Sequence, residues 1–282
     1  MSEKYRGFIK DGHKFENIIY TKDDYKATIT INREEKLNCV NLETITELIT
    51  AFKDSAWDDN IAVVVLTGAG KRAFSTGADL QEQEEYFLDN PEDYYKWMAE
   101  FIGLHELMRN LGKPTIARLN GMVVGGGNEL NMSCDLAIAA DHVEIGQVGA
   151  ARGSVAAAGA TQFLPLIVGD RRAREILFLC ERLPAEKALD WGLVNQVVPY
   201  EKLDEAVDIM AKKLFNKLPE CLRYTKQQLN FWRDLSWHTT IGHARDWLSM
   251  HNLSDEVKEG ILAFNEKRDI DYKKIRDSKK KK

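Results

Sequence analysis

The sequence contains only four cysteines, and their positions form no metal-binding or redox motif. They are scattered along the chain without C-x-x-C spacing, and the six histidines have no pair at the i, i+4 spacing of a helical metal site. We therefore expect no bound metal and a reducing, cytoplasmic environment. The cysteines are Cys39, Cys134, Cys180 and Cys221.

Long hydrophobic segments are also absent. The N-terminal residues, MSEKYRGFIKDG, contain no apolar core of the kind that a signal peptide requires. Elsewhere the apolar runs are short and are interrupted by glycine or by charged residues. This pattern excludes a conventional membrane-spanning helix.

The charge distribution gives no sign of a nucleic-acid partner. The net charge is −5, with basic and acidic residues interleaved, so no broad positive face is expected. The one basic run, residues 279–282, reads as a solvated end of the chain, with weak binding of anionic phosphates as the alternative. A chain of 282 residues with 44% hydrophobic content can bury one large core, with or without a smaller appendage.

Hydrophobic periodicity predicts alternating strands and helices in the first two thirds of the chain. Asn41 is placed to cap a helix whose apolar positions recur at helical spacing. Strands that alternate with helices predict an α/β fold with crossover connections. After Pro199 only helices are predicted, so we divide the chain into residues 1–199 and 200–282. The predicted strands are residues 25–32, 61–66, 115–119 and 136–139; the predicted C-terminal helices are residues 203–218, 224–235, 243–253 and 256–267.

The segment GMVVGGGNELNMSCD, residues 121–135, has the strongest chemical signature. Three adjacent glycines precede a predicted helix with Glu129 in its first turn. Glycines let a backbone approach a ligand closely, and a helix start directs unpaired N–H groups and a positive dipole toward it. This predicts an anion-stabilising site beside a carboxylate. The alternative is that Glu129 only stabilises the helix dipole. Asp135 is expected to end or cap the same helix.

The turn AFSTGAD, residues 73–79, is a second candidate. It follows a predicted buried strand and contains Gly77, so it can expose backbone N–H groups opposite the glycine triplet. Such turns are common, and an ordinary structural role remains the alternative.

Several ordered segments resemble the crotonase (enoyl-CoA hydratase/isomerase) superfamily between about residues 29 and 267. The resemblance implies a ββα superhelix core in residues 1–199 and a helical trimerisation region in residues 200–282, giving a homotrimer or a dimer of trimers. It also implies an acyl-CoA thioester substrate and no cofactor besides its CoA. The segments are INREEKLN (31–38), AFSTGADL (73–80), KPTIARLNGMVVGGGNEL (113–130), CDLAIAA (134–140), GQVG (146–149), TQFLPLIVG (161–169) and ALDWGLVNQVVP (188–199).

The same resemblance implies roles for individual residues. The backbone N–H groups of Ser75 and Gly126 would hold the thioester oxygen, and Glu129 would handle protons or water. The CoA adenine would be held by the turn near Ala73 and Ala78, which also contains Gly77.

One position departs from ordinary hydratases. Gly149 stands where their GQPE motif carries a second glutamate, so one carboxylate must both activate water and deliver a proton, or another group must assist. GQVGAARGS is similar instead to the branch that contains naphthoate synthase and the ketocyclohexane-carbonyl-CoA hydrolases. Ala156 and Asn252 replace an aspartate and a tyrosine of naphthoate synthase, which argues against ring closure.

The nearest resemblance is to the family of 6-oxocyclohex-1-ene-1-carbonyl-CoA hydrolases. It rests on the GGG-x-E motif and on residues 153–169, 219–221 and 252–266. This chain lacks an insertion that the family is expected to carry after residue 199. A related ring is therefore an alternative substrate. The resemblance implies water addition to a cyclic oxoacyl-CoA followed by opening of the ring. Residues 155–158, starting with Val155, would form an apolar wall for that ring. The candidates for orienting water or the ring carbonyl are Asn128, Gln147 and Asn252.

Two other functions remain open at this point. A simpler hydratase would add water to an enoyl-CoA or dienoyl-CoA without breaking a C–C bond. A catalytically inactive CoA-binding subunit is the third reading, and the presence of Glu129 argues against it.

Overall fold

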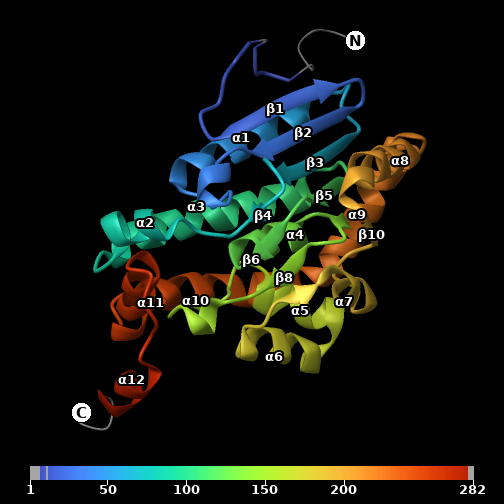
Figure 1. Ribbon diagram of the computed structural model, residues 1–282. Helices are drawn as coiled ribbons and strands as arrows, with labels where there is room; N and C mark the ends of the chain where they lie inside the picture. Colours follow the sequence, from blue (N-terminus) through green and yellow to red (C-terminus); the bar gives the residue numbers. More distant parts are fainter. Residues whose placement is uncertain (1–6, 11, 279–282) are drawn as a thin grey trace.

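The computed structural model describes residues 7–10 and 12–278, and these residues form two β-sheets surrounded by helices (Figure 1). This is the predicted mixed α/β architecture with a helical C-terminal region, so the predicted fold class is confirmed. The predicted basic tail, residues 279–282, lies outside the described residues.

The larger sheet has six strands in the order β1-β2-β3-β5-β7-β10, and all neighbours are parallel except β1 and β2. The four predicted strands are confirmed as β2, β3, β5 and β7, which are adjacent in this sheet. All six residues of β3 are buried, as expected for an inner parallel strand with both faces covered. The strands are β1 (Ile18–Asp23), β2 (Lys26–Ile31), β3 (Val63–Gly68), β5 (Thr115–Leu119), β7 (Leu136–Ala140) and β10 (Gln196–Val198).

The sequence did not reveal β1 or the second sheet. β1 pairs with β2 through a tight turn in which Asp24 adopts a left-handed φ of 51°. The second sheet has the order β4-β6-β8-β9, and its strands have two or three residues each, too few to show a period of two. These strands are β4 (Ala73–Ser75), β6 (Met122–Val124), β8 (Glu144–Gly146) and β9 (Leu183–Pro184).

The helices between strands begin where the sequence supplies caps. Asn41 caps α1, because its side-chain oxygen accepts a hydrogen bond from the Thr44 amide at 2.9 Å. Asn90 caps α3, because its side-chain oxygen accepts from the Asp93 amide, and Pro91 is the first residue of the helix. These helices are α1 (Leu42–Trp57), α2 (Leu80–Glu82), α3 (Pro91–Asn110), α4 (Gly126–Ser133), α5 (Ala160–Val168), α6 (Asp170–Leu179) and α7 (Ala185–Asp190), with short 3-10 or π segments η2 (Glu34–Lys36), η3 (Gln83–Phe87) and η4 (Gly149–Ala151).

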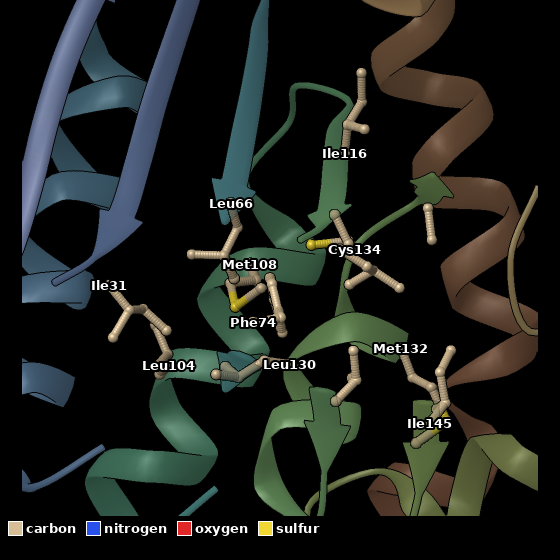
Figure 2. Close-up of a cluster of buried hydrophobic side chains, with 14 of the residues drawn as sticks. Ile31, Leu66, Phe74, Leu104, Met108, Ile116, Leu130, Met132, Cys134 and Ile145 are labelled. Carbon is tan, nitrogen blue, oxygen red and sulfur yellow. The ribbon is translucent and has the colours of Figure 1, made fainter. Parts of the chain in front are cut away.

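One continuous hydrophobic core joins the two sheets. Figure 2 shows Leu66 of β3, Phe74 of β4 and Leu130 of α4 meeting in its centre. Leu104 and Met108 reach the same cluster from α3. The start of α4 is therefore held against the end of β4 by buried apolar side chains on several sides.

The C-terminal region is helical, as predicted, but its helix boundaries differ from the prediction. Pro219 occupies the first turn of α9, so this helix starts five residues earlier than its periodicity indicated. The division of the chain at residue 199 stays a prediction.

None of the helices in the described residues has the length and apolar character needed to cross a membrane. The elements are η5 (Tyr200–Lys202), α8 (Leu203–Phe215), α9 (Pro219–Arg233), α10 (Leu235–His251), α11 (Asp255–Asn265) and α12 (Tyr272–Ser278).

Asp135 does not cap α4. Its carboxylate accepts a hydrogen bond from the Thr115 amide at 2.7 Å and pairs with the buried Lys226 ammonium at 2.8 Å. α4 does end just before Asp135, but Cys134 takes the cap position. The capping role was wrong because Lys226, far away in sequence on α9, pairs with the Asp135 carboxylate.

A buried ion pair ties the C-terminal helices to α3. The Nε atom of Arg109 donates to Asp234 at 3.0 Å, and both side chains are almost fully buried. The Arg109 guanidinium also lies 3.9 Å from the ring centroid of Trp237. Because Asp234 lies between α9 and α10, this pair links the junction of these two helices to α3.

We predict that Asp234→Ala lowers the free energy of unfolding by about 3–5 kcal/mol, because it leaves the Arg109 charge buried without its partner. Urea unfolding followed by circular dichroism measures the loss. Asp246→Ala is the control: Asp246 pairs with Arg245 at the surface, and exposed pairs contribute at most about 1 kcal/mol. Equal small losses in both variants would contradict the predicted importance of the buried pair.

Candidate active site

A cavity of about 550 Å³ lies between the short second sheet, α3 and the C-terminal helices. The turn after β4 and the start of α4 form one end of its lining. The loop between β8 and α5 also lines it, together with residues of α2, α3, α10 and α11 and of the segment around η2. In Figure 1, α10 and α11 lie below α2 and α3, so the last part of the chain covers a site built by the first.

The turn after β4 and the start of α4 touch backbone to backbone. A Cβ atom on Gly77 would lie 2.7 Å from the Gly126 nitrogen, and one on Gly127 would lie 2.0 Å from the Ser75 oxygen. Gly77 and Gly125 also have left-handed φ angles of 86° and 58°. The glycines are therefore required by close approach and by backbone conformation.

Two backbone N–H groups at this contact are free to bind a ligand. The amide and carbonyl groups of Val40 bond to Gly77 and Asp79, so the amide of Ala78 between them is left unpaired by the described residues. Gly126 is the first residue of α4, where the amide has no partner within the helix. Ala78 and Gly126 both line the cavity.

Ser75 does not lie where the sequence interpretation placed it. The predicted role was for its backbone N–H group, but the whole residue is buried in β4 and is absent from the cavity lining. Ala73 and Gly77 also lie outside the lining, and Asn128 is fully buried on the inner side of α4. The hydrogen bonds between Val40 and the turn decide which amide of the turn stays free, and the sequence does not show these bonds.

Glu129 lies in the cavity, as the sequence analysis anticipated. The residue is 5% exposed, and its Oε1 atom has no hydrogen-bond partner among the described residues. Burial raises the pKa of the carboxyl to about 8, whereas the amides of Ala160, Ala158 and Ala157 act in the opposite direction. A carboxyl group with a pKa near neutrality can both accept and donate a proton.

The remaining predicted site residues lie in the lining. Gln147 is almost fully buried, and its side-chain amide donates to the Gly125 carbonyl at 3.2 Å. The Asn252 amide donates to the Phe87 carbonyl. Val155 and the alanines after it form part of the wall. A Cβ on Gly149 would lie 2.9 Å from the Ser154 oxygen, so a longer side chain there would require the loop to shift.

The sequence analysis missed an aromatic wall on α3. Tyr94, Trp97, Met98 and Phe101 line the cavity at the i, i+3, i+4, i+7 spacing of one helix face. Phe264 of α11 joins the lining. The spacing was visible in the sequence, but it is the spacing of ordinary core residues and carries no functional signal by itself.

The sequence model of the family described as Enoyl-CoA hydratase/isomerase matches residues 24–276. The chain belongs to this family. The match covers every strand except β1 and extends into the C-terminal helices, and it confirms the crotonase superfamily that the motifs predicted. The protein is thus an acyl-CoA enzyme of the enoyl-CoA hydratase/isomerase type.

Solved structures of family members resemble this fold over nearly their whole length. An enoyl-CoA hydratase from Mycobacterium avium subsp. paratuberculosis K-10 is 27% identical with a TM-score of 0.83, covering 92% of this chain and 99% of that one. An enoyl-CoA hydratase from Bacillus anthracis is 32% identical with a TM-score of 0.74, and the match covers 91% of this chain and 99% of that one. A carnitinyl-CoA hydratase from Mycobacterium avium is 30% identical with a TM-score of 0.80, and the match covers 91% of this chain and 98% of that one.

We predict that Gly77→Ala reduces turnover by about 100- to 1,000-fold, the usual loss when one donor to a developing oxyanion is removed. The new Cβ would displace the Gly126 amide. The absorbance of bound 4-(dimethylamino)cinnamoyl-CoA reports polarisation of the thioester carbonyl, and its red shift should decrease in the same variant. Gly103→Ala on α3, where a Cβ meets nothing within 4 Å, is the control and should behave as wild type. A wild-type red shift in the Gly77→Ala protein would refute this role of the contact.

The raised pKa of Glu129 predicts how stability depends on pH. The folded protein keeps the proton up to about pH 8, whereas the unfolded chain loses it near the ordinary value of 4.5. The stabilising effect of protonation is therefore complete below about pH 4.5 and disappears as the pH rises through 8. Relative to Glu129→Gln, the wild-type free energy of unfolding should fall by up to about 1.4 kcal/mol per pH unit in this window. Parallel urea titrations of the two proteins test this; a constant difference from pH 5 to 8 would exclude the shift.

Proposed function

We propose that this enzyme adds water to a cyclic oxoacyl-CoA and then opens the ring hydrolytically, as a 6-oxocyclohex-1-ene-1-carbonyl-CoA hydrolase does. The observation that carries the proposal is the buried Glu129 carboxyl, which shares one largely apolar cavity with the free amides of Ala78 and Gly126. Gly149, in the same cavity, carries no second carboxylate.

The amides of Ala78 and Gly126 are the proposed donors to the thioester oxygen, so Ala78 takes the role that the sequence suggested for Ser75. They would stabilise the negative charge that develops when the thioester becomes an enolate. Glu129 takes a proton from water, and the water oxygen adds to the β-carbon of the conjugated double bond. The protonated Glu129 then returns the proton to the α-carbon, so that one carboxyl serves both steps.

Ring opening uses the same groups a second time. Glu129 removes a proton from a second water, which adds to the ring ketone. The bond between the ketone carbon and the α-carbon then breaks, and its electron pair becomes the thioester enolate held by the two amides. Protonation of the α-carbon leaves an open chain with a new carboxylate at the former ketone carbon, still attached to CoA.

The apolar side chains that line the cavity favour a ring-shaped acyl group. The wall formed by residues 155–158 is apolar, and the flat side chains of Trp97 and Phe101 line the same space. A flat or puckered ring fills such a space with little loss of conformational freedom.

A hydratase that stops after the first water is the second candidate. It is favoured by the similarity to solved structures named enoyl-CoA hydratases. It requires the same Glu129 and the same amide pair. The buried carboxyl beside two unpaired amides argues against an inactive CoA-binding subunit.

We further propose self-association through the C-terminal helices, as a homotrimer or a dimer of trimers. On α9, Phe231 is 78% exposed and Trp232 is 72% exposed, which favours burial against another copy of the chain. The enzyme would work in the reducing cytoplasm, and the four cysteines are free thiols. It would use no metal and no cofactor besides the CoA of its substrate.

The decisive test is the mass of the product formed from 6-oxocyclohex-1-ene-1-carbonyl-CoA. Ring opening adds two waters, whereas hydration alone adds one, and an NMR spectrum confirms the new carboxylate. Glu129→Gln should lower kcat by at least about 100-fold and leave acyl-CoA binding intact, because the amide cannot take up the proton. A single added water would select the hydratase, and unchanged turnover in the variant would remove Glu129 from the mechanism.

A further inference from the structure

Tyr94 is a polar residue in the aromatic wall that the mechanism does not use. It lies on the inner face of α3, is 7% exposed and lines the cavity with Glu129. Its ring is fixed by its neighbours: the ring of Trp97 is nearly parallel to it, with planes 5° apart and centroids 6.0 Å apart. Phe87 packs on it from η3, with centroids 6.2 Å apart.

The Tyr94 hydroxyl has no hydrogen-bond partner among the described residues, and it is not one of the fully enclosed polar atoms of the interior, so it is accessible from the cavity. Buried tyrosines almost always place their hydroxyl against a partner, because an unpaired buried polar group is costly. Two amides in the same lining are already engaged, since Gln147 donates to Gly125 and Asn252 donates to Phe87. Tyr94 therefore brings an uncommitted O–H group into an aromatic wall of the cavity.

The surroundings of Tyr94 keep this group a donor. Burial raises the pKa of the phenol, and the negative charge of Glu129 raises it further. The hydroxyl thus stays protonated throughout the range in which the enzyme would work. Tyr94 and Glu129 both line this cavity.

We propose that Tyr94 determines specificity by donating a hydrogen bond to an oxygen on the acyl group, beyond the thioester carbonyl. The inference rests on the proposed function, in which that oxygen is the ring ketone. A fixed donor in an apolar wall selects acyl groups that carry such an oxygen, because an acyl group without one leaves the hydroxyl unpaired.

Binding measurements test the inference without turnover. The Glu129→Gln protein is titrated by calorimetry with 6-oxocyclohex-1-ene-1-carbonyl-CoA and with cyclohex-1-ene-1-carbonyl-CoA, which lacks the ketone. We expect about tenfold tighter binding of the oxo ligand, in the range of one neutral hydrogen bond. Adding Tyr94→Phe should remove this preference and leave the affinity for the ligand without the ketone unchanged.

Tyr95→Phe in the same background is the matched control. Tyr95 is the next residue on α3, is 39% exposed and stacks under the Arg245 guanidinium outside the cavity lining. This variant should keep the preference for the oxo ligand. No preference in the Glu129→Gln protein, a preference that survives Tyr94→Phe, or an equal loss with Tyr95→Phe would each overturn the inference.

An infrared measurement keeps the inference testable if Tyr94→Phe fails to fold. In the Glu129→Gln protein, the ketone C=O stretch of the bound oxo ligand should lie below its position in an apolar solvent. A band at the apolar-solvent position would overturn the inference. The proposed function fails separately, through the absence of a ring-opened product from the wild-type enzyme.

Discussion

The contact between two glycine-containing stretches of backbone is the constraint on which the rest of the site depends. Gly77 lies against the Gly126 nitrogen, and Gly127 lies against the Ser75 oxygen, with no room for a Cβ at either position. This closeness requires β4 and β6 to pair, and it requires α4 to begin immediately after β6. This contact between the two segments thus brings the amides of Ala78 and Gly126, which are far apart in sequence, to one cavity.

The electrostatics of the site result from two opposing effects on Glu129. The start of α4 and three nearby amides favour the charged carboxylate, but burial in an apolar cavity disfavours it more strongly, and the pKa rises to about 8. Burial therefore decides the outcome. The same loss of water that makes Glu129 difficult to ionise also strengthens the hydrogen bonds that the two amides can offer to an oxyanion. Acid and base chemistry and enolate stabilisation thus both depend on the low polarity of this cavity.

Local signals predicted the parts of the site that depend on local structure. The cap at Asn41, the glycine triplet and Glu129 at the start of a helix follow from short stretches of sequence. The family resemblance assigned the thioester oxygen to Ser75 and the CoA adenine to the turn near Ala78. Sequence does not show which amides of a turn remain free, and the hydrogen bonds that decide this come from Val40. The position of Tyr94 follows the helical period of any core residue, so only the tertiary structure separates a cavity wall from a core.

The segments before and after residue 130 contribute different groups to this cavity. The amides and Glu129 come from the segments before residue 130, whereas much of the acyl-facing wall comes from the loop after β8 and from α10 and α11. That loop is held by another close approach: a Cβ on Gly260 would lie 2.0 Å from the Arg152 oxygen, and one on Gly153 would lie 2.2 Å from the Glu256 oxygen. The loop after β8 therefore packs tightly against α11, so the docking of the C-terminal helices helps to shape the wall that this loop forms. Changes there can alter which acyl group fits and leave the enolate-stabilising groups in place.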